Sequence, residues 1–134
     1  MTFLLHNEAL GKLILRLTVG VLILFHGVAK ITGPATVDYI AGQLTASGLP
    51  SVLAYGVYVG EIVAPLMLIV GVFTRWGGML IVVNMLFAIG LSHMGDLFAL
   101  TEHGGYRLEL QFFYLFCGLA VMFLGSGRYA FKPD

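Results

Sequence analysis

The sequence predicts an all-α membrane protein: an antiparallel bundle of four transmembrane helices, with a short amphipathic helix in an outer loop. The first observation is composition, since 59% of the 134 residues are hydrophobic and 10% are charged. A soluble domain is about 45–50% apolar and about 25% charged. The second is that four apolar stretches each approach the ~20 residues that cross a bilayer core. The third is that none alternates with period two, which argues against a small β-barrel.

Charge and cysteine content exclude several classes of protein. Seven Lys and Arg against seven Asp and Glu give no net charge, so a basic surface for nucleic acid is not expected. The single cysteine, Cys117, excludes an internal disulfide, a CxxC redox pair and a cysteine-rich zinc site. Of the four histidines only His26 lies within a helix body, and we find no haem, flavin or metal motif.

The expected transmembrane helices form one domain, residues 1–134, and span about 13–31, 52–73, 77–93 and 108–124. The first carries Arg16, His26 and Lys30 and lacks a small-residue cleavage site, so we interpret it as a retained helix and not a signal peptide. The connection 74–76 is so short that the second and third helices must form a hairpin.

A short amphipathic helix is expected in the outer loop between residues 32 and 51. Its apolar residues recur at helical spacing: Val37, Ile40, Ala41 and Leu44. Gly48 and Pro50 would end it. An ordinary ordered loop is the alternative.

Loop charges predict the orientation in the membrane. One side of the four-helix arrangement carries five basic residues: Lys12, Arg16, Arg75, Arg128 and Lys132. The other side has only Lys30 and Arg107. The positive-inside rule therefore places both termini in the cytoplasm.

Several polar residues fall inside the expected helices, where a charge costs at least ~2.5–3.5 kcal/mol on insertion scales. At 100° per residue, Arg16, His26 and Lys30 lie within an arc of about 80° on the first helix. Gly20 and Gly27 share or border that arc. Because glycines let another helix approach closely, this face should turn toward the protein interior.

Glu61 lies near the midpoint of the second helix, and Pro65 follows four residues later. Proline has no N–H to donate to the Glu61 carbonyl, and its ring crowds that oxygen. We therefore expect a kink there.

The rise of 1.5 Å per residue predicts which polar residues share a depth. His26 should lie near Glu61, and Lys30 near Glu109. Asn84, at mid-depth in the third helix, would complete the inner cluster.

Two further groups of polar residues lie toward the ends of the expected helices. Arg16 lies on the cytoplasmic half, where we expect its side chain to snorkel to the interface. On the fourth helix Arg107, Gln111 and Tyr114 share a stripe, while Glu109 points almost opposite Arg107. Both charges cannot face one cavity unless the helix begins after them.

The candidates for ligand binding or proton relay are His26, Glu61, Lys30, Arg16, Asn84, Glu109, Gln111 and Tyr114. No catalytic residue is assigned. The alternative interpretation is structural: a buried Glu–Lys or Glu–His pair only fixes helix packing.

The chain resembles the DoxX family over nearly its whole length. The resemblance rests on Arg16-Leu17-Thr18-Val19-Gly20, Phe25-His26-Gly27-Val28-Ala29-Lys30, Gly48-Leu49-Pro50, Gly60-Glu61, residues 68–75, and Gly125-Ser126-Gly127-Arg128-Tyr129. The end differs, because residues 130–134 lack the Ser-Leu-Asp that commonly follows that tyrosine.

The resemblance implies a four-helix protein of the bacterial cytoplasmic (inner) membrane, associated with quinol oxidase and thiosulfate:quinone oxidoreductase systems or with oxidative-stress complexes. Family polar positions would correspond to Arg16, His26, Lys30 and Glu61, without a catalytic role. It also implies a redox protein partner, and self-association into a homo-oligomer is a further candidate.

Three functions are therefore considered. The first is an accessory redox subunit whose polar cluster binds a quinone-like ligand between helices, with His26 and Glu61 bonding a quinone oxygen and passing protons. The second is a non-enzymatic structural or assembly protein. The third is a small proton-coupled transporter, which four helices without a strong inverted repeat support least.

Overall fold

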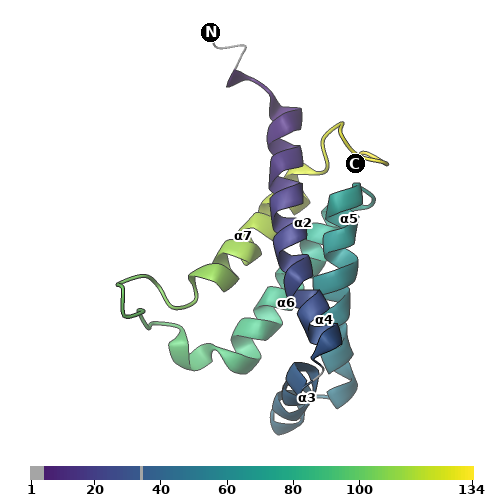
Figure 1. Cartoon of the computed structure of the whole chain (residues 1–134). Coiled ribbons are helices and arrows are strands. Elements are labelled where there is room, and N and C mark those ends of the chain that lie inside the picture. The colour runs from purple at the N-terminus through teal and green to yellow at the C-terminus, as the bar shows by residue number, and fades with distance from the viewer. Residues whose placement is uncertain (1–4, 34) are drawn as a thin grey trace.

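The computed structural model describes residues 5–33 and 35–134 and is all-helical, with 74% of it in helices. The elements in chain order are α2 (Glu8–Thr32), α3 (Ala35–Ala46), a 3₁₀-helix (Ser51–Tyr55), α4 (Gly56–Tyr58), a π-helix (Val59–Val63), α5 (Ala64–Val70), α6 (Thr74–Ser92), a 3₁₀-helix (Met94–Asp96) and α7 (Glu109–Leu124). Figure 1 shows α3 at the far end of the molecule from the start of α2 and the labelled C-terminus.

Three helical segments are long and apolar enough to cross a membrane: Glu8–Thr32, Ser51–Val70 and Thr74–Ser92. The fourth apolar helix, α7, has 16 residues and a length of about 24 Å. Large apolar side chains such as Phe25, Phe113 and Phe116 lie exposed on these helices. An exposed apolar surface of this kind suits lipid, so the prediction of an all-helical membrane protein is confirmed.

The helix ends differ from the sequence-based boundaries by a few residues. The second span ends at Val70 and not at 73, because Gly71 adopts the left-handed conformation (φ 82°) that closes many helices. Phe73 is also left-handed (φ 48°), so the chain reverses quickly and α6 begins at Thr74. At the other end of the chain, α2 begins at Glu8, with the Asn7 side chain accepting a hydrogen bond from the backbone of Leu10 (3.0 Å).

The expected helix in the loop after the first span is present as α3. Val37 and Leu44 of the predicted stripe are buried and cluster with Ala54. The helix ends before Gly48, which is left-handed (φ 80°). The apolar stripe is therefore the packing face of α3.

The core of the molecule lies between α2, α5, α6 and α7. Its innermost side chains are at most 2% exposed: Val19, Ile23, Ala64, Leu68, Ile81, Leu108 and Val121. Helices α6 and α7 approach closely where Gly78 meets the Gly118 carbonyl, because a Cβ atom on Gly78 would lie 2.6 Å from that oxygen.

The distortion expected at Pro65 takes the form of the π-helix Val59–Val63. Its last turn is closed by the Ala64 N–H, which donates to the carbonyl of Val59, five residues earlier. Pro65 is the second residue of α5, in the first turn, where a missing N–H is tolerated. Glu61 is thereby placed in a π turn, a feature that is frequent at functional sites.

The last residues of the chain fold back onto the turn between α5 and α6. The Phe131 N–H donates to the Val70 carbonyl (3.1 Å), and the Lys132 N–H donates to the Gly71 carbonyl (2.9 Å). We call residues 125–134 the C-terminal segment. It lies at the same end of the molecule as the start of α2 (Figure 1).

Candidate functional site

A cavity of about 670 Å³ lies between the helices. Six of the eight predicted site residues line it, and we call them the polar belt: His26, Lys30, Glu61, Asn84, Gln111 and Tyr114. Much of the remaining lining is apolar, including Ile23, Leu80 and Met85. Small-molecule sites have volumes of about 300–1,000 Å³ and combine apolar walls with a few polar groups, so the cavity has the size and character of a ligand site.

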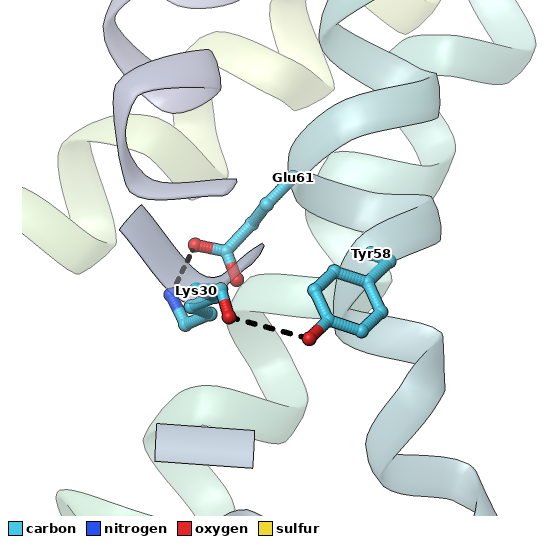
Figure 2. A network of polar contacts seen from close by, with 3 residues as sticks. All are labelled: Lys30, Tyr58 and Glu61. Atoms are coloured by element: carbon cyan, nitrogen blue, oxygen red, sulfur yellow. Dashed lines mark hydrogen bonds and ion pairs between the residues drawn. The ribbon is translucent and has the colours of Figure 1, made fainter. Parts of the chain in front are cut away.

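An ion pair between the partly buried Lys30 and the buried Glu61 occupies the polar belt (Figure 2). Lys30 Nζ lies 2.6 Å from Glu61 Oε1, and the two side chains are 17% and 7% exposed. The Tyr58 hydroxyl donates a hydrogen bond to the backbone carbonyl of Lys30 (3.3 Å), which the helix end leaves unpaired. The last turn of α2 is thus joined to α4 and the π-helix, and the two charges neutralise each other.

The pairing of Lys30 with Glu109 was wrong: Lys30 bonds to Glu61. Helical side chains slant toward the N-terminus of their helix. The long Lys30 side chain therefore extends back along α2, and its Nζ atom reaches the depth of Glu61 although its Cα lies at a different depth. Glu109 lies exposed in the first turn of α7 and does not line the cavity. A carboxylate is favourable there because of the helix dipole.

His26 reaches the cavity but makes a different contact from the one expected. Its ring meets Tyr114 edge-on, with ring centroids 6.0 Å apart and planes at 81°. Lys30, one turn later on α2, takes the Glu61 carboxylate in its place. The histidine therefore joins α2 to α7, while Lys30 joins α2 to the π-helix.

Gln111 and Asn84 add two amides to the polar belt. Gln111 precedes Tyr114 by one turn of α7, and its Oε1 atom is buried with no hydrogen-bond partner among the described residues. Asn84 of α6 packs against Gly60, where an added Cβ atom would lie 2.5 Å from the Asn84 side chain. The belt consequently carries one amide on α7, whose oxygen is buried away from the open cavity, and one amide on α6.

The expectation that Arg16 snorkels to the interface was wrong, because its residue is 1% exposed and lies outside the cavity. Its guanidinium donates from Nη1 to the Leu68 carbonyl (3.0 Å) and from Nη2 to the Tyr129 carbonyl. The C-terminal segment covers this side chain, and both terminal nitrogens of Arg16 find backbone acceptors, while its Nε is buried with no partner among the described residues.

Arg75 is a second arginine anchor, which was not predicted from the sequence. Its Nη1 donates to the carbonyls of Met122 (3.1 Å) and Phe123 (2.8 Å), and its Nε donates to the Asp134 backbone oxygen (2.9 Å). The Asp134 side chain accepts from the Arg75 backbone N–H (3.0 Å). The sequence signal for this anchor was the position of Arg75 itself: a basic residue beside a tight turn can reach the unpaired carbonyls at the end of a helix.

The fourth helix begins after Arg107, which resolves how Arg107 and Glu109 are arranged. Arg107 is exposed, with its Nε 3.8 Å from Asp96 Oδ1. Arg107, which precedes α7, and Glu109, in its first turn, both lie outside the cavity lining.

The arrangement suits binding of an uncharged, amphipathic molecule. The paired Lys30 and Glu61 leave no net charge for a ligand to neutralise, while the belt still presents hydrogen-bond donors and acceptors. Within residues 5–33 and 35–134, no group of three His, Cys, Asp or Glu is placed to hold a metal ion.

Comparisons with known proteins agree with the sequence resemblance. The DoxX family model matches residues 11–94, which include most of the first span, all of the second and third spans, and the Lys30–Glu61 pair. A protein of Haemophilus influenzae, described as uncharacterized, is 34% identical over 120 residues, covering 87% of this chain and 84% of that protein. No solved structure matches the chain. The helical fold, the matched segment and this relative together show that the chain belongs to the DoxX family.

Proposed function

We propose that this chain is an accessory subunit of a redox system in the bacterial cytoplasmic membrane and binds a quinone-like ligand in its cavity. The observation that carries the proposal is the buried Lys30–Glu61 pair, which lines a cavity of about 670 Å³ with apolar walls. Ionisable groups within a membrane are costly and are commonly kept for function.

The shape of the cavity supports a ligand with a polar head and an apolar body. Its lining on α6 extends from Leu80 to Ser92, which corresponds to about 18 Å of helix. The polar belt lies partway along this length, and apolar residues such as Leu80 and Leu91 extend beyond it. A ring held by the belt would leave room for an attached chain.

The remaining parts of the proposal concern topology and partners. We propose one domain with four antiparallel spans and both termini on one side of the membrane, because the C-terminal segment and the start of α2 lie at one end. The basic residues at that end favour the cytoplasmic side. The sequence has a single cysteine and no haem or flavin motif, so a redox protein partner would exchange electrons with the ligand. The chain itself would bind and position that ligand without independent catalysis, alone or as a homo-oligomer.

Mass spectrometry of the organic extract from the detergent-purified protein tests the proposal. The wild type should carry a quinone or quinol in near-stoichiometric amount, and Glu61→Gln should carry less. Glu109→Gln is the matched control, since it makes the same change at an exposed carboxylate outside the cavity. A Lys30→Gln/Glu61→Gln double variant avoids leaving a lone buried charge. Phospholipid alone, identical in all samples, would contradict the proposal.

A second candidate function is structural, as an assembly or scaffold protein. It is favoured by the anchors at helix ends, where Arg16 and Arg75 bond to the carbonyls of α5 and α7. In that case the Lys30–Glu61 pair would only fix helix packing, and removing it would lower stability without changing any bound molecule. Stability measurements on the same variants separate the two functions.

A further inference from the structure

The lining of the cavity changes from buried to exposed in one direction along the molecule. On α2, Ile23 is buried, whereas His26, about one turn closer to α3, is exposed. On α7, Tyr114 is buried, whereas Leu110, about one turn closer to the start of the helix, is exposed. Both changes run toward the end of the molecule that carries α3 (Figure 1). The cavity is therefore open toward α3.

An apolar core separates the cavity from the opposite end. Val19, Leu68 and Ile81 are at most 2% exposed and do not line the cavity. Beyond them Arg16 is buried beneath the C-terminal segment, where it bonds to the carbonyls of Leu68 and Tyr129. Water inside a protein needs polar partners, and the side chains of this core offer none. Among the described residues, water therefore has no polar path to the belt from the end that holds the C-terminal segment.

Polar side chains continue from the belt toward α3. Thr36 and Tyr39 of α3 line the cavity, as do Ser92 and His93 where α6 ends. Thr36, Tyr39 and Ser92 are exposed. Hydroxyl and imidazole groups both form hydrogen bonds with water. The lining thus offers water a polar route from the α3 end to the belt.

The cavity also has an apolar opening partway along its length. Val59 of the π-helix and Val83 and Phe87 of α6 line it and are exposed at the surface of the spans. An exposed apolar surface at this depth faces lipid. This opening suits the apolar chain of a ligand, but it does not admit water.

We infer that water reaches the polar belt from the α3 side alone, so that a ligand ring held there exchanges protons with that side of the membrane. The inference rests on the proposed function for the identity of the ligand. Reduction of a quinone to a hydroquinone takes two electrons and two protons. The redox partner supplies the electrons, and water on the α3 side supplies the protons. With both termini in the cytoplasm, the α3 side is the outer face.

A series of single cysteines along α6 tests this access. Asn84, Ala88 and Ser92 recur every four residues on one face of the helix, and all three line the cavity. Each is replaced by cysteine in the full chain carrying Cys117→Ala. A small, charged, membrane-impermeant thiosulfonate is then added to intact spheroplasts and to inverted vesicles. Glu102→Cys and Lys132→Cys identify the side that the reagent reaches in each preparation, so the result does not depend on the orientation of the chain.

Asn84→Cys, Ala88→Cys and Ser92→Cys should react only in the preparation in which Glu102→Cys reacts. Leu86→Cys is the matched control, because Leu86 is exposed on the same helix but does not line the cavity. A thiol surrounded by lipid is kept from its reactive, ionised form, so Asn84→Cys should react at least about tenfold faster than Leu86→Cys. Ala88→Cys and Ser92→Cys are mild changes that keep the test valid if Asn84→Cys does not fold.

Protection by a ligand separates this inference from the proposed function. A fully substituted benzoquinone with a decyl chain should slow the reaction of Ala88→Cys and leave that of Glu102→Cys unchanged. One-sided reaction without protection would support the inference and contradict the proposed function. Reaction of Ala88→Cys from the Lys132 side, from both sides, or no faster than that of Leu86→Cys would overturn the inference, whether or not the quinone protects.

Discussion

Gly27 of α2 lies directly against the backbone carbonyl of Glu61, so closely that a Cβ atom at Gly27 would overlap that oxygen. Pro65, four residues after Glu61, has no N–H to donate to this carbonyl. The missing side chain at position 27 lets α2 approach the π-helix. The same approach brings Lys30 Nζ within 2.6 Å of Glu61 Oε1.

Gly27→Ala should therefore push α2 away from the π-helix and lower the free energy of unfolding by about 1–3 kcal/mol. Gly11→Ala is the control in the same helix, because no described atom lies within 4 Å of an added Cβ there. That control should be neutral or slightly stabilising, since alanine favours helices over glycine. Unfolding by SDS titration measures both, and equal stability of the two variants would contradict the close approach.

The Lys30–Glu61 pair should show strong coupling in a double-mutant cycle. Lys30→Met leaves a buried carboxylate unpaired and should cost about 3–5 kcal/mol, and Glu61→Gln leaves the ammonium unpaired. The Lys30→Met/Glu61→Gln variant should cost less than the sum of the two single changes.

A matched cycle on the exposed Arg107–Asp96 pair, which is 3.8 Å apart, provides the control. Its coupling should stay below about 1 kcal/mol because water screens such pairs. Equal coupling in the two cycles would show that the Lys30–Glu61 pair gains nothing from its burial.

Arg16→Leu should release the C-terminal segment. The guanidinium bonds to the Leu68 and Tyr129 carbonyls, so its loss removes a link between that segment and α5. Hydrogen exchange of the Phe131 and Lys132 amides, measured by mass spectrometry, should become faster. Arg128→Leu is the control, because Arg128 is exposed and contacts its neighbour Tyr129. Unchanged exchange in Arg16→Leu would mean that the segment is held by other contacts.

Cysteine labelling checks the proposed orientation. In a Cys117→Ala background, a cysteine replacing the exposed Glu102 should react with a membrane-impermeant maleimide added to intact spheroplasts. A cysteine replacing the exposed Lys132 should react only after permeabilisation. The reverse pattern would place both termini outside the cytoplasm.

Much of the fold was predictable because hydrophobicity and helical spacing are local properties. The stripe of Val37 and Leu44 indicated α3 and its buried face. Pro65 indicated where the second span is distorted, although its position alone does not distinguish a kink from a π turn. Composition and segment length were sufficient to predict the membrane class.

The contacts within the site were harder to predict. The depth of a residue in the membrane was calculated from the position of its Cα, which paired Lys30 with Glu109. The lysine side chain instead extends back along α2 to Glu61. The burial of Arg16 depends on the carbonyl of Tyr129, and no local pattern links these two positions. Site contacts made by long flexible side chains, or to backbone acceptors distant in the sequence, therefore could not be predicted from the sequence.

The contact between Arg16 and Tyr129 has a consequence for the order in which the protein matures. Tyr129 lies 113 residues after Arg16, and ribosomes synthesise chains from the N-terminus. The first helix therefore enters the membrane with a guanidinium whose second acceptor has not yet been made. Because an unpaired arginine is costly in an apolar environment, we expect Arg16 to take its buried position only after Tyr129 has been synthesised, and a chain cut short before Tyr129 would lack that acceptor.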